Sequence, residues 1–274
     1  LGVRLVGSEM GIRDRLSSNR SRRWHSHLQR LWSCGLAAGA KHTIRLRWSV
    51  EGVDCLRQKG PLIILARHGS QGDGLLAGAL LLKEGRRLRF ILKKQLLGDP
   101  CLDVVGHRIP NYFVDRDSLD NKEELTNIGV LARDMADDEA LIIFPEGTRF
   151  SEEKLAKAIA ALSETAPTRV KSASELRSVL PPRTAGTLAA LAESNADIVI
   201  CNHVGISDIS SLRQLRAAVP LQTQLKFKLW RTPRSDVNQT QFVQWLDAQW
   251  AIVDDWVTNN EDVSSPSVSY THLR

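Results

Sequence analysis

PLIILARHGSQGD, at residues 61–73, is the stretch that decides the fold. Its first six residues form a continuous apolar run, which is typical of a strand buried on both faces of a parallel sheet. A polar turn with two glycines follows, and residues 73–84 have the pattern of a helix that ends at Gly85. A buried strand, a turn and a helix in this order predict an α/β fold.

The same alternation of strand and helix signals continues along the chain. Further strands are expected at residues 88–92, 113–114, 140–144, 198–201 and 224–230. Further helices are expected at residues 119–135, 152–162, 185–193 and 242–257. The pattern predicts a largely parallel central sheet flanked by helices, in one domain at residues 49–258. The polar, Ser-rich stretch at residues 259–274 is expected to be a disordered tail.

Positive charge is concentrated near the start of the chain. The net charge is +6, but the first 50 residues hold ten Lys and Arg against two acids, while the other 27 bases face 29 acids. One face of an expected helix at residues 20–38 carries four large apolar side chains, Trp24, Leu28, Leu31 and Trp32. Arg and Trp on an amphipathic helix suit the surface of an anionic bilayer. We therefore expect residues 1–48 to face a membrane, the alternative being a helix packed on the domain with a solvated basic face.

The cysteines and the apolar runs exclude several classes of protein. No two of the four cysteines have C-x-x-C spacing, so neither a zinc site nor a redox motif is indicated. A small secreted scaffold would be much richer in Cys, which favours a reducing compartment. The apolar runs are shorter than the roughly 20 residues that cross a bilayer.

His68 and Asp73 stand in the turn that follows the first buried strand. Ligand sites of open α/β sheets lie at the carboxyl ends of strands, so the position suits chemistry. Five residues apart, the two side chains would not share a helical face, and Gly69 and Gly72 allow a loop to bring them together. An imidazole held by a carboxylate can take a proton from a hydroxyl through its other nitrogen. The plainer alternative is a pair of ordinary turn residues.

Two further strand ends carry arginines. FPEGTR at residues 144–149 follows a buried strand, and Arg149 can bind a phosphate through two parallel hydrogen bonds. YFVDR at residues 112–116 places Arg116 after another strand. Surface ion pairs with nearby acids are the alternative for each arginine; the candidate acids are Asp115, Asp117 and Glu146.

The His-x4-Asp box and FPEGTR, about 75 residues apart, together resemble the glycerolipid acyltransferases of the lysophosphatidate acyltransferase type. YFVDR resembles the second block of that family, and LPPRTAG at residues 180–186 resembles its Pro-Arg-x-x-Gly stretch. The Trp-rich segment at residues 245–256 resembles the C-terminal helix of the family. The resemblance covers roughly residues 45–258.

This resemblance implies an enzyme that acylates a lysophospholipid, foremost 1-acylglycerol-3-phosphate, to give phosphatidate. His68 would act as general base on the free hydroxyl, and Asp73 would orient it. The acceptor would be held by Arg116, Glu146, Gly147, Thr148 and Arg149. Acyl-CoA or acyl-carrier protein would be the co-substrate, with no metal and no other cofactor. The implied location is the cytoplasmic face of a membrane.

The chain departs from the family pattern at three places. Arg67 precedes the histidine where Asn or Ser is usual, and Pro110 stands where the second block usually opens with Gly. The fourth block, often Val-Pro after a strand, has no clean match near residues 198–203. The two catalytic boxes are intact, so these departures bear on the acceptor and on the acyl preference.

Parts of the sequence are also compatible with three other functions. HGSQG at residues 68–72 nearly matches the G-x-S-x-G turn of serine hydrolases, with Ser70 as nucleophile and His203 as the late histidine. A non-catalytic module could bind anionic membranes through the basic segment. A nucleic-acid binder could stack bases on its tryptophans, but the near-neutral remainder of the chain disfavours this.

Overall fold

The structure, a computed structural model, describes residues 18–70, 72–93, 109–114, 121–205, 216, 219–222 and 224–261. Within these residues a seven-stranded sheet forms the centre of the molecule, in the order β1-β7-β6-β2-β5-β3-β4. The strands are β1 (Trp48–Glu51), β2 (Leu62–Ala66), β3 (Arg87–Lys93), β4 (Asn111–Val114), β5 (Glu139–Ile143), β6 (Asp197–Val204) and β7 (Leu225–Thr232). Neighbouring strands are parallel except β6 and β7, which are antiparallel.

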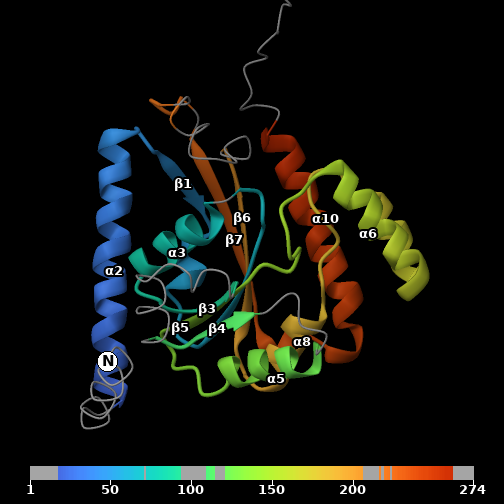
Figure 1. Ribbon diagram of the computed structural model, residues 1–274, viewed down its shortest axis with the longest axis horizontal. Coiled ribbons are helices and arrows are strands. Elements are labelled where there is room, and N and C mark those ends of the chain that lie inside the picture. Colours follow the sequence, from blue (N-terminus) through green and yellow to red (C-terminus); the bar gives the residue numbers. More distant parts are fainter. Residues whose placement is uncertain are drawn as a thin grey trace, which may run out of the picture.

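Helices cover both faces of this sheet (Figure 1). They are α2 (Ser18–Thr43), α3 (Asp73–Lys83), α5 (Asn121–Ala132), α6 (Glu152–Thr165), α7 (Val170–Ser174), α8 (Ala185–Ala192) and α10 (Phe242–Glu261). Short 3-10 turns lie at Val53–Leu56, Pro167–Arg169, Arg234–Asp236 and Gln239–Gln241. The predicted α/β class, with a largely parallel sheet between helices, is confirmed.

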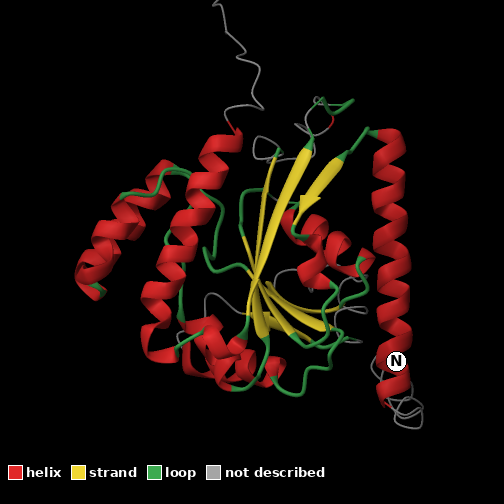
Figure 2. Ribbon diagram, turned by 180° about the vertical axis from the view of Figure 1, so that it is seen from behind, coloured by secondary structure: helices red, strands yellow, loops and turns green. Residues whose placement is uncertain are grey.

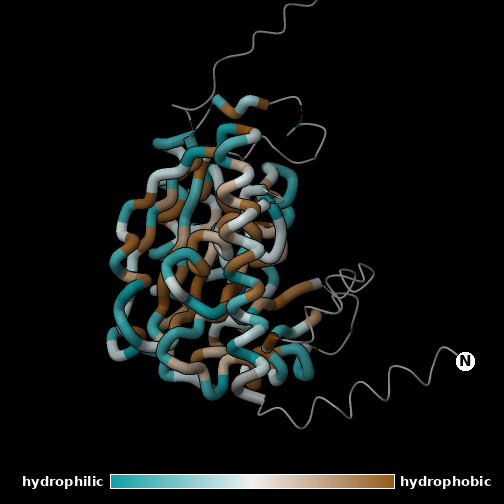
Figure 3. Tube along the Cα trace, turned by 90° about the vertical axis from the view of Figure 1, so that its left-hand side faces the viewer, coloured by the Kyte–Doolittle hydropathy of each residue, from teal (hydrophilic) through white to brown (hydrophobic). Residues whose placement is uncertain are grey.

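Two apolar cores form because the residues of each strand alternate between the two faces of the sheet. Ile64 of β2 lies in the core under α3, together with Leu80 and Leu81 of that helix. Ile63 and Leu65 point the other way, into the core covered by α5, α8 and α10. Figure 2 shows α2 and α3 on one side of the strands and α10 on the other. Figure 3 shows hydrophobic residues, in brown, running through the interior where the strands lie.

Helix α2 packs on α3 through small polar residues and turns its large apolar side chains outward. Ser26 and Ser33 are buried, whereas Trp24 and Leu31 are 64% and 72% exposed. Leu28, Trp32 and Leu36 are exposed as well. The helix thus combines both sequence-based alternatives, since it contacts the domain and also presents an apolar stripe to its surroundings. None of the helices in the described part of the chain is long and apolar enough to cross a bilayer.

The structure also differs from the expected elements in detail. Strand β1 was not expected, and it pairs with β7 at the edge of the sheet. Helix α5 ends at Ala132 and not at the predicted residue 135, and α10 continues to Glu261. The antiparallel pairing of β6 and β7 could not be inferred from apolar runs, because a buried strand has the same composition in either direction.

Candidate active site

The candidate site lies where β2 and β6 end side by side. These two parallel strands pair in register, with Ala66 opposite Cys201. His68 lies two residues beyond Ala66, in the loop after β2. His203 lies two residues beyond Cys201, near the end of β6. Side chains two residues apart point to the same face of a sheet, so both histidines lie on the face covered by α3. Asp73, the first residue of α3, faces both of them.

The carboxylate of Asp73 accepts four hydrogen bonds, two on each oxygen. Oδ2 lies 3.1 Å from His68 Nδ1 and 2.8 Å from the main-chain nitrogen of Ser70. Oδ1 lies 2.7 Å from His203 Nε2 and also accepts from the Ser70 hydroxyl. An ionised carboxylate has about four acceptor positions, so every one of them is occupied. The loop therefore holds Asp73 in one orientation.

Asp73 is ionised in this environment. Its side chain is 1% exposed, and burial by itself disfavours the charge. The charge and hydrogen bond of His203, with the hydrogen bonds from His68 and Ser70, outweigh the burial and hold the pKa of Asp73 well below its usual range. The N-terminus of α3 adds a favourable dipole. Because an ionised carboxylate only accepts hydrogen bonds, the proton of His68 must sit on Nδ1, which leaves Nε2 to accept a proton.

His68 is accessible to a substrate in a way that Asp73 is not. Its side chain keeps 23% exposure, and its ring packs against Phe144, with centroids 5.0 Å apart. The structure thus brings together the two residues of the predicted dyad, and the role of His68 as a general base stays a prediction.

Ser70 lies inside the loop and not at its surface. The residue is 1% exposed, its hydroxyl donates to Asp73, and its oxygen accepts from Gly72 N at 3.1 Å. A nucleophilic serine must reach its substrate and must pass its proton to a histidine. The hydroxyl of Ser70 already donates one hydrogen bond and accepts another within the loop, which disfavours the serine hydrolase alternative.

Glu146 links the His68 loop to a second loop. Its Oε1 accepts from His68 N at 2.9 Å, and its Oε2 accepts from Leu180 N at 3.0 Å. Burial raises the pKa of this carboxyl to about 7, against the opposing effect of these two hydrogen bonds. Contact of Glu146 with a lysophospholipid substrate stays a prediction. In the structure both of its carboxylate oxygens accept hydrogen bonds from main-chain amides.

The rest of the FPEGTR turn faces helix α6. Gly147 has a φ of +72°, and the guanidinium of Arg183 lies so close that a Cβ on Gly147 would stand 3.1 Å from its central carbon. Thr148 Oγ1 accepts from Lys154 Nζ at 3.1 Å. Arg149 is partly exposed, and no carboxylate in the described residues pairs with its guanidinium. The predicted acceptor residue Arg116, with Asp115 and Asp117, lies outside the described residues.

A cavity of about 400 Å³ opens beside this turn. Its basic lining residues are Lys154, Lys157, Arg169 and Arg183, and its apolar ones come chiefly from α6 and the Leu180–Pro182 loop. No residue of α6 is buried, so its apolar side is available to the cavity. The space suits a ligand that has an anionic group and an apolar part.

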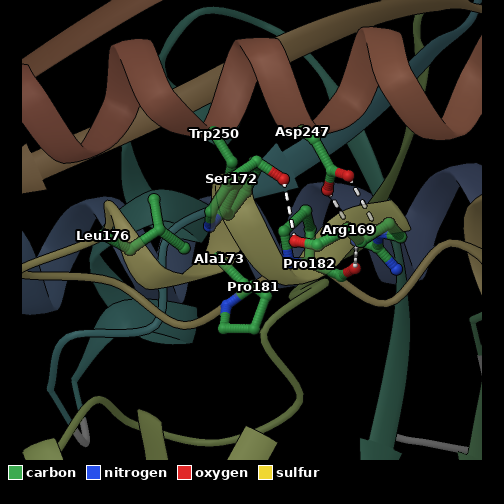
Figure 4. A pocket seen from close by; sticks show the side chains of 8 residues that line it. All are labelled: Arg169, Ser172, Ala173, Leu176, Pro181, Pro182, Asp247 and Trp250. Carbon is green, nitrogen blue, oxygen red and sulfur yellow. Dashed lines mark hydrogen bonds and ion pairs between the residues drawn. The ribbon is translucent and has the colours of Figure 1, made fainter. Parts of the chain in front are cut away.

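The loop that ends in Arg183 is anchored to α10. Arg169 Nε donates to Asp247 Oδ2 at 2.8 Å, and Arg169 Nη2 donates to the main-chain oxygen of Pro182, also at 2.8 Å. Figure 4 shows these side chains between α7 and α10. The hollow that they line measures about 10 Å³, enough for one water molecule, so these contacts hold the Leu180–Pro182 loop in place beside the larger cavity.

Metal binding has no obvious place in this arrangement. Among the described residues, no group of three His, Cys, Asp or Glu side chains is positioned to hold a metal ion. The expectation that the enzyme needs neither a metal nor another cofactor stays a prediction.

The position of His203 beside Asp73 was not predicted from the sequence, which offered this residue only as the late histidine of a serine hydrolase. The available signal was its place at the end of an apolar strand, like His68. Knowing that these two strands are neighbours requires the strand order, which the sequence alone does not contain.

Comparison with known proteins is consistent with this geometry. The family model described as Acyltransferase matches residues 47–183, which is half of the chain. The crystal structure of the 1-acyl-sn-glycerophosphate (LPA) acyltransferase PlsC from Thermotoga maritima is similar over 93% of this chain and 88% of that chain. The TM-score is 0.57 and the sequence identity is 14%, so this likeness concerns the fold.

Proposed function

Because the chain belongs to the acyltransferase family, we propose that it moves a fatty acyl group from acyl-CoA or acyl-carrier protein to the free hydroxyl of a lysophospholipid. The acceptor we propose is 1-acylglycerol-3-phosphate, and the product is phosphatidate. The observation that carries this proposal is the hydrogen bond of 3.1 Å between His68 Nδ1 and Asp73 Oδ2, at the end of a parallel strand. The name of the similar crystal structure, an LPA acyltransferase, supports the choice of acceptor.

The reaction needs one base and good positioning. His68 Nε2 takes the proton of the acceptor hydroxyl while the oxygen attacks the thioester carbonyl carbon. The tetrahedral intermediate collapses with cleavage of the carbon–sulfur bond, and the leaving thiolate takes the proton back from His68. Asp73 stays ionised throughout and stabilises the imidazolium that forms. No bond between the acyl group and the enzyme is required.

The acceptor phosphate would be held at the FPEGTR turn. Arg149 has the geometry for a bidentate contact with phosphate, and Thr148 has a hydroxyl beside it. The adjacent cavity adds the ammonium of Lys154 and the guanidinium of Arg183. Arg116 would complete this set. A phosphate here would leave the glycerol hydroxyl to be presented to His68.

We also propose that α2 rests on an anionic membrane, on its cytoplasmic side. Its outward stripe of Trp24, Leu28, Leu31 and Trp32 would enter the headgroup region, where indole rings are favourable. The arginines around this stripe would meet anionic lipid. A lysophospholipid resides in such a membrane, so this contact would deliver the acceptor.

A transfer assay tests the reaction. Labelled acyl-CoA and 1-acylglycerol-3-phosphate in anionic vesicles are incubated with wild type, with His68→Ala, and with Arg133→Ala as a control. Arg133 is an exposed residue whose guanidinium pairs with Glu193 at 2.7 Å. We expect phosphatidate formation by wild type and the control, and a loss of about 100-fold or more in His68→Ala. Equal rates in all three would refute the mechanism, and release of free fatty acid alone would indicate a hydrolase.

A further inference from the structure

Asp73 holds two imidazoles, and only one of them belongs to the predicted dyad. His203 Nε2 lies 2.7 Å from Asp73 Oδ1, a shorter contact than the 3.1 Å between Asp73 Oδ2 and His68 Nδ1. Since the carboxylate accepts, Nε2 of His203 carries the proton. The side chain of His203 is 5% exposed, so this contact is made away from solvent.

The fold brings His203 to this position by strand register. Cys201 and His203 share one face of β6, and Cys201 lies opposite Ala66 of β2. The ring of His203 stacks on Phe227 of β7, with centroids 5.9 Å apart and planes 18° apart. These contacts fix the ring on three sides, by its own strand, by the neighbouring strand and by α3.

The main chain at His203 is fixed as well. Arg67, buried in the loop after β2, donates from Nη1 to the main-chain oxygen of His203 at 2.8 Å. Its Nη2 forms an ion pair of 2.9 Å with Glu261 at the end of α10. Arg67 directly precedes the proposed base His68, and it is thus bound to His203, the residue that donates to Oδ1 of Asp73.

We propose that His203 is a positioning residue for this acyl transfer, which holds the carboxylate that orients the base His68. The proposal rests on the function proposed above. The Nε2–H of His203 fixes the plane of the carboxylate, and through it the direction of His68 Nε2.

Loss of this donor has a predictable effect on the orientation of the base. Asp73 then keeps the hydrogen bonds from His68 and Ser70 but loses the donor that β6 supplies to Oδ1. The direction of His68 Nε2 is less well fixed, so a smaller fraction of His68 is oriented to take the proton of the acceptor hydroxyl. Substrate binding does not involve His203, so the loss should appear in kcat and not in KM.

Three variants separate positioning from mere packing. His203→Phe keeps a ring against Phe227 but has no donor, whereas His203→Gln keeps an N–H donor. Cys201→Ala is the matched control, since Cys201 is buried on the same face of the same strand. We expect His203→Phe to lose roughly tenfold in kcat, with the KM for each substrate within about twofold of the wild-type value. We expect the kcat of His203→Gln to stay within about threefold of wild type, and Cys201→Ala to keep the wild-type kcat and KM.

A second readout does not depend on turnover. The NMR resonances of the His68 imidazole should change in His203→Phe, because the ring is no longer held in one orientation, and should stay close to those of wild type in Cys201→Ala. Unchanged His68 resonances in a folded His203→Phe protein would overturn the proposal, as would an equal loss of kcat in Cys201→Ala. If wild type transfers no acyl group, or if His68→Ala is fully active, the proposed function itself fails. These outcomes are distinct from a failure confined to His203.

Discussion

At the scale of single residues, Arg149 tests the proposal that the turn after β5 binds the acceptor phosphate. Its guanidinium is partly exposed and pairs with no carboxylate in the described residues. Arg149→Ala should therefore raise the KM for 1-acylglycerol-3-phosphate about tenfold or more, because a charge-assisted pair with phosphate is lost. The KM for the acyl donor should stay close to the wild-type value. Initial rates with each substrate varied in turn provide the measurement.

The control for Arg149 is Arg133→Ala, which removes a similar charge at the end of α5. It should change neither constant by more than about twofold, since an exposed ion pair contributes little. Equal losses for acceptor and donor in Arg149→Ala would show that the turn does not bind the acceptor phosphate.

Site residues could be predicted from the sequence where they lie close together in the chain. His68 and Asp73 stand in one short loop, so their spacing alone indicated that they could meet. His203 lies 130 residues from Asp73, and only strand order brings it there. The two hydrogen bonds of Glu146 likewise join loops that are far apart in sequence, so its linking role could not be predicted. For Ser70 the pattern suggested a nucleophile, but burial and two hydrogen bonds leave it no such freedom.

At the scale of elements, α2 is the clearest test of membrane contact. We expect the combined substitution of Trp24, Leu31 and Trp32 by Ser to reduce sedimentation with anionic vesicles at least fivefold, because the lost apolar area drives insertion. These residues are exposed, so the thermal unfolding midpoint should change little. Vesicle sedimentation and thermal unfolding are measured on the same preparations.

Ile252→Ser is the control for α2, because Ile252 is half exposed on α10, on the opposite side of the sheet (Figure 1). It should sediment as wild type does. If both variants lose binding equally, or if neither does, α2 is not the membrane-binding surface.

Some strands and helices could be predicted from the sequence and others could not. Strong apolar runs predicted β2, β5 and β6, because strands buried on both faces consist almost entirely of such residues. Strand β1 has alternating half-buried and exposed residues at the edge of the sheet, and its four residues give no comparable signal. Helix α7 has five residues, too few for a helical period to be visible.

At the scale of the whole molecule, the buried Glu146 couples stability to pH. Burial raises its pKa to about 7 in the folded state, whereas a solvated glutamate titrates near 4.5. Between these values the folded protein keeps a proton that the unfolded chain releases. This contribution to stability is complete below about pH 4.5 and is lost as the pH rises toward about 7, with a slope of at most about 1.4 kcal/mol per pH unit.

Urea unfolding at several pH values between about 5 and about 7 measures this slope. Glu146→Gln cannot titrate, so its stability should depend less steeply on pH over this range than that of wild type. Glu152→Gln, at an exposed position in the first turn of α6, should keep the wild-type slope. Identical slopes for wild type and Glu146→Gln would exclude the raised pKa.

The family resemblance inferred from the sequence is confirmed by the family model, and the predicted fold class by the structure. The division into residues 1–48, 49–258 and 259–274 stays a prediction. What the sequence could not supply is the order of the strands, and that order determines which loops meet.

The parallel register of β2 and β6 makes the site far more sensitive to insertions than to substitutions. One extra residue between Ile198 and His203 would turn the imidazole to the face covered by α10 and bring Asn202 to the face covered by α3. Two extra residues would restore the face but move the ring about 7 Å along the strand, beyond reach of Asp73. An insertion into the strand before residue 203 should therefore reduce activity more than any single substitution of His203 does.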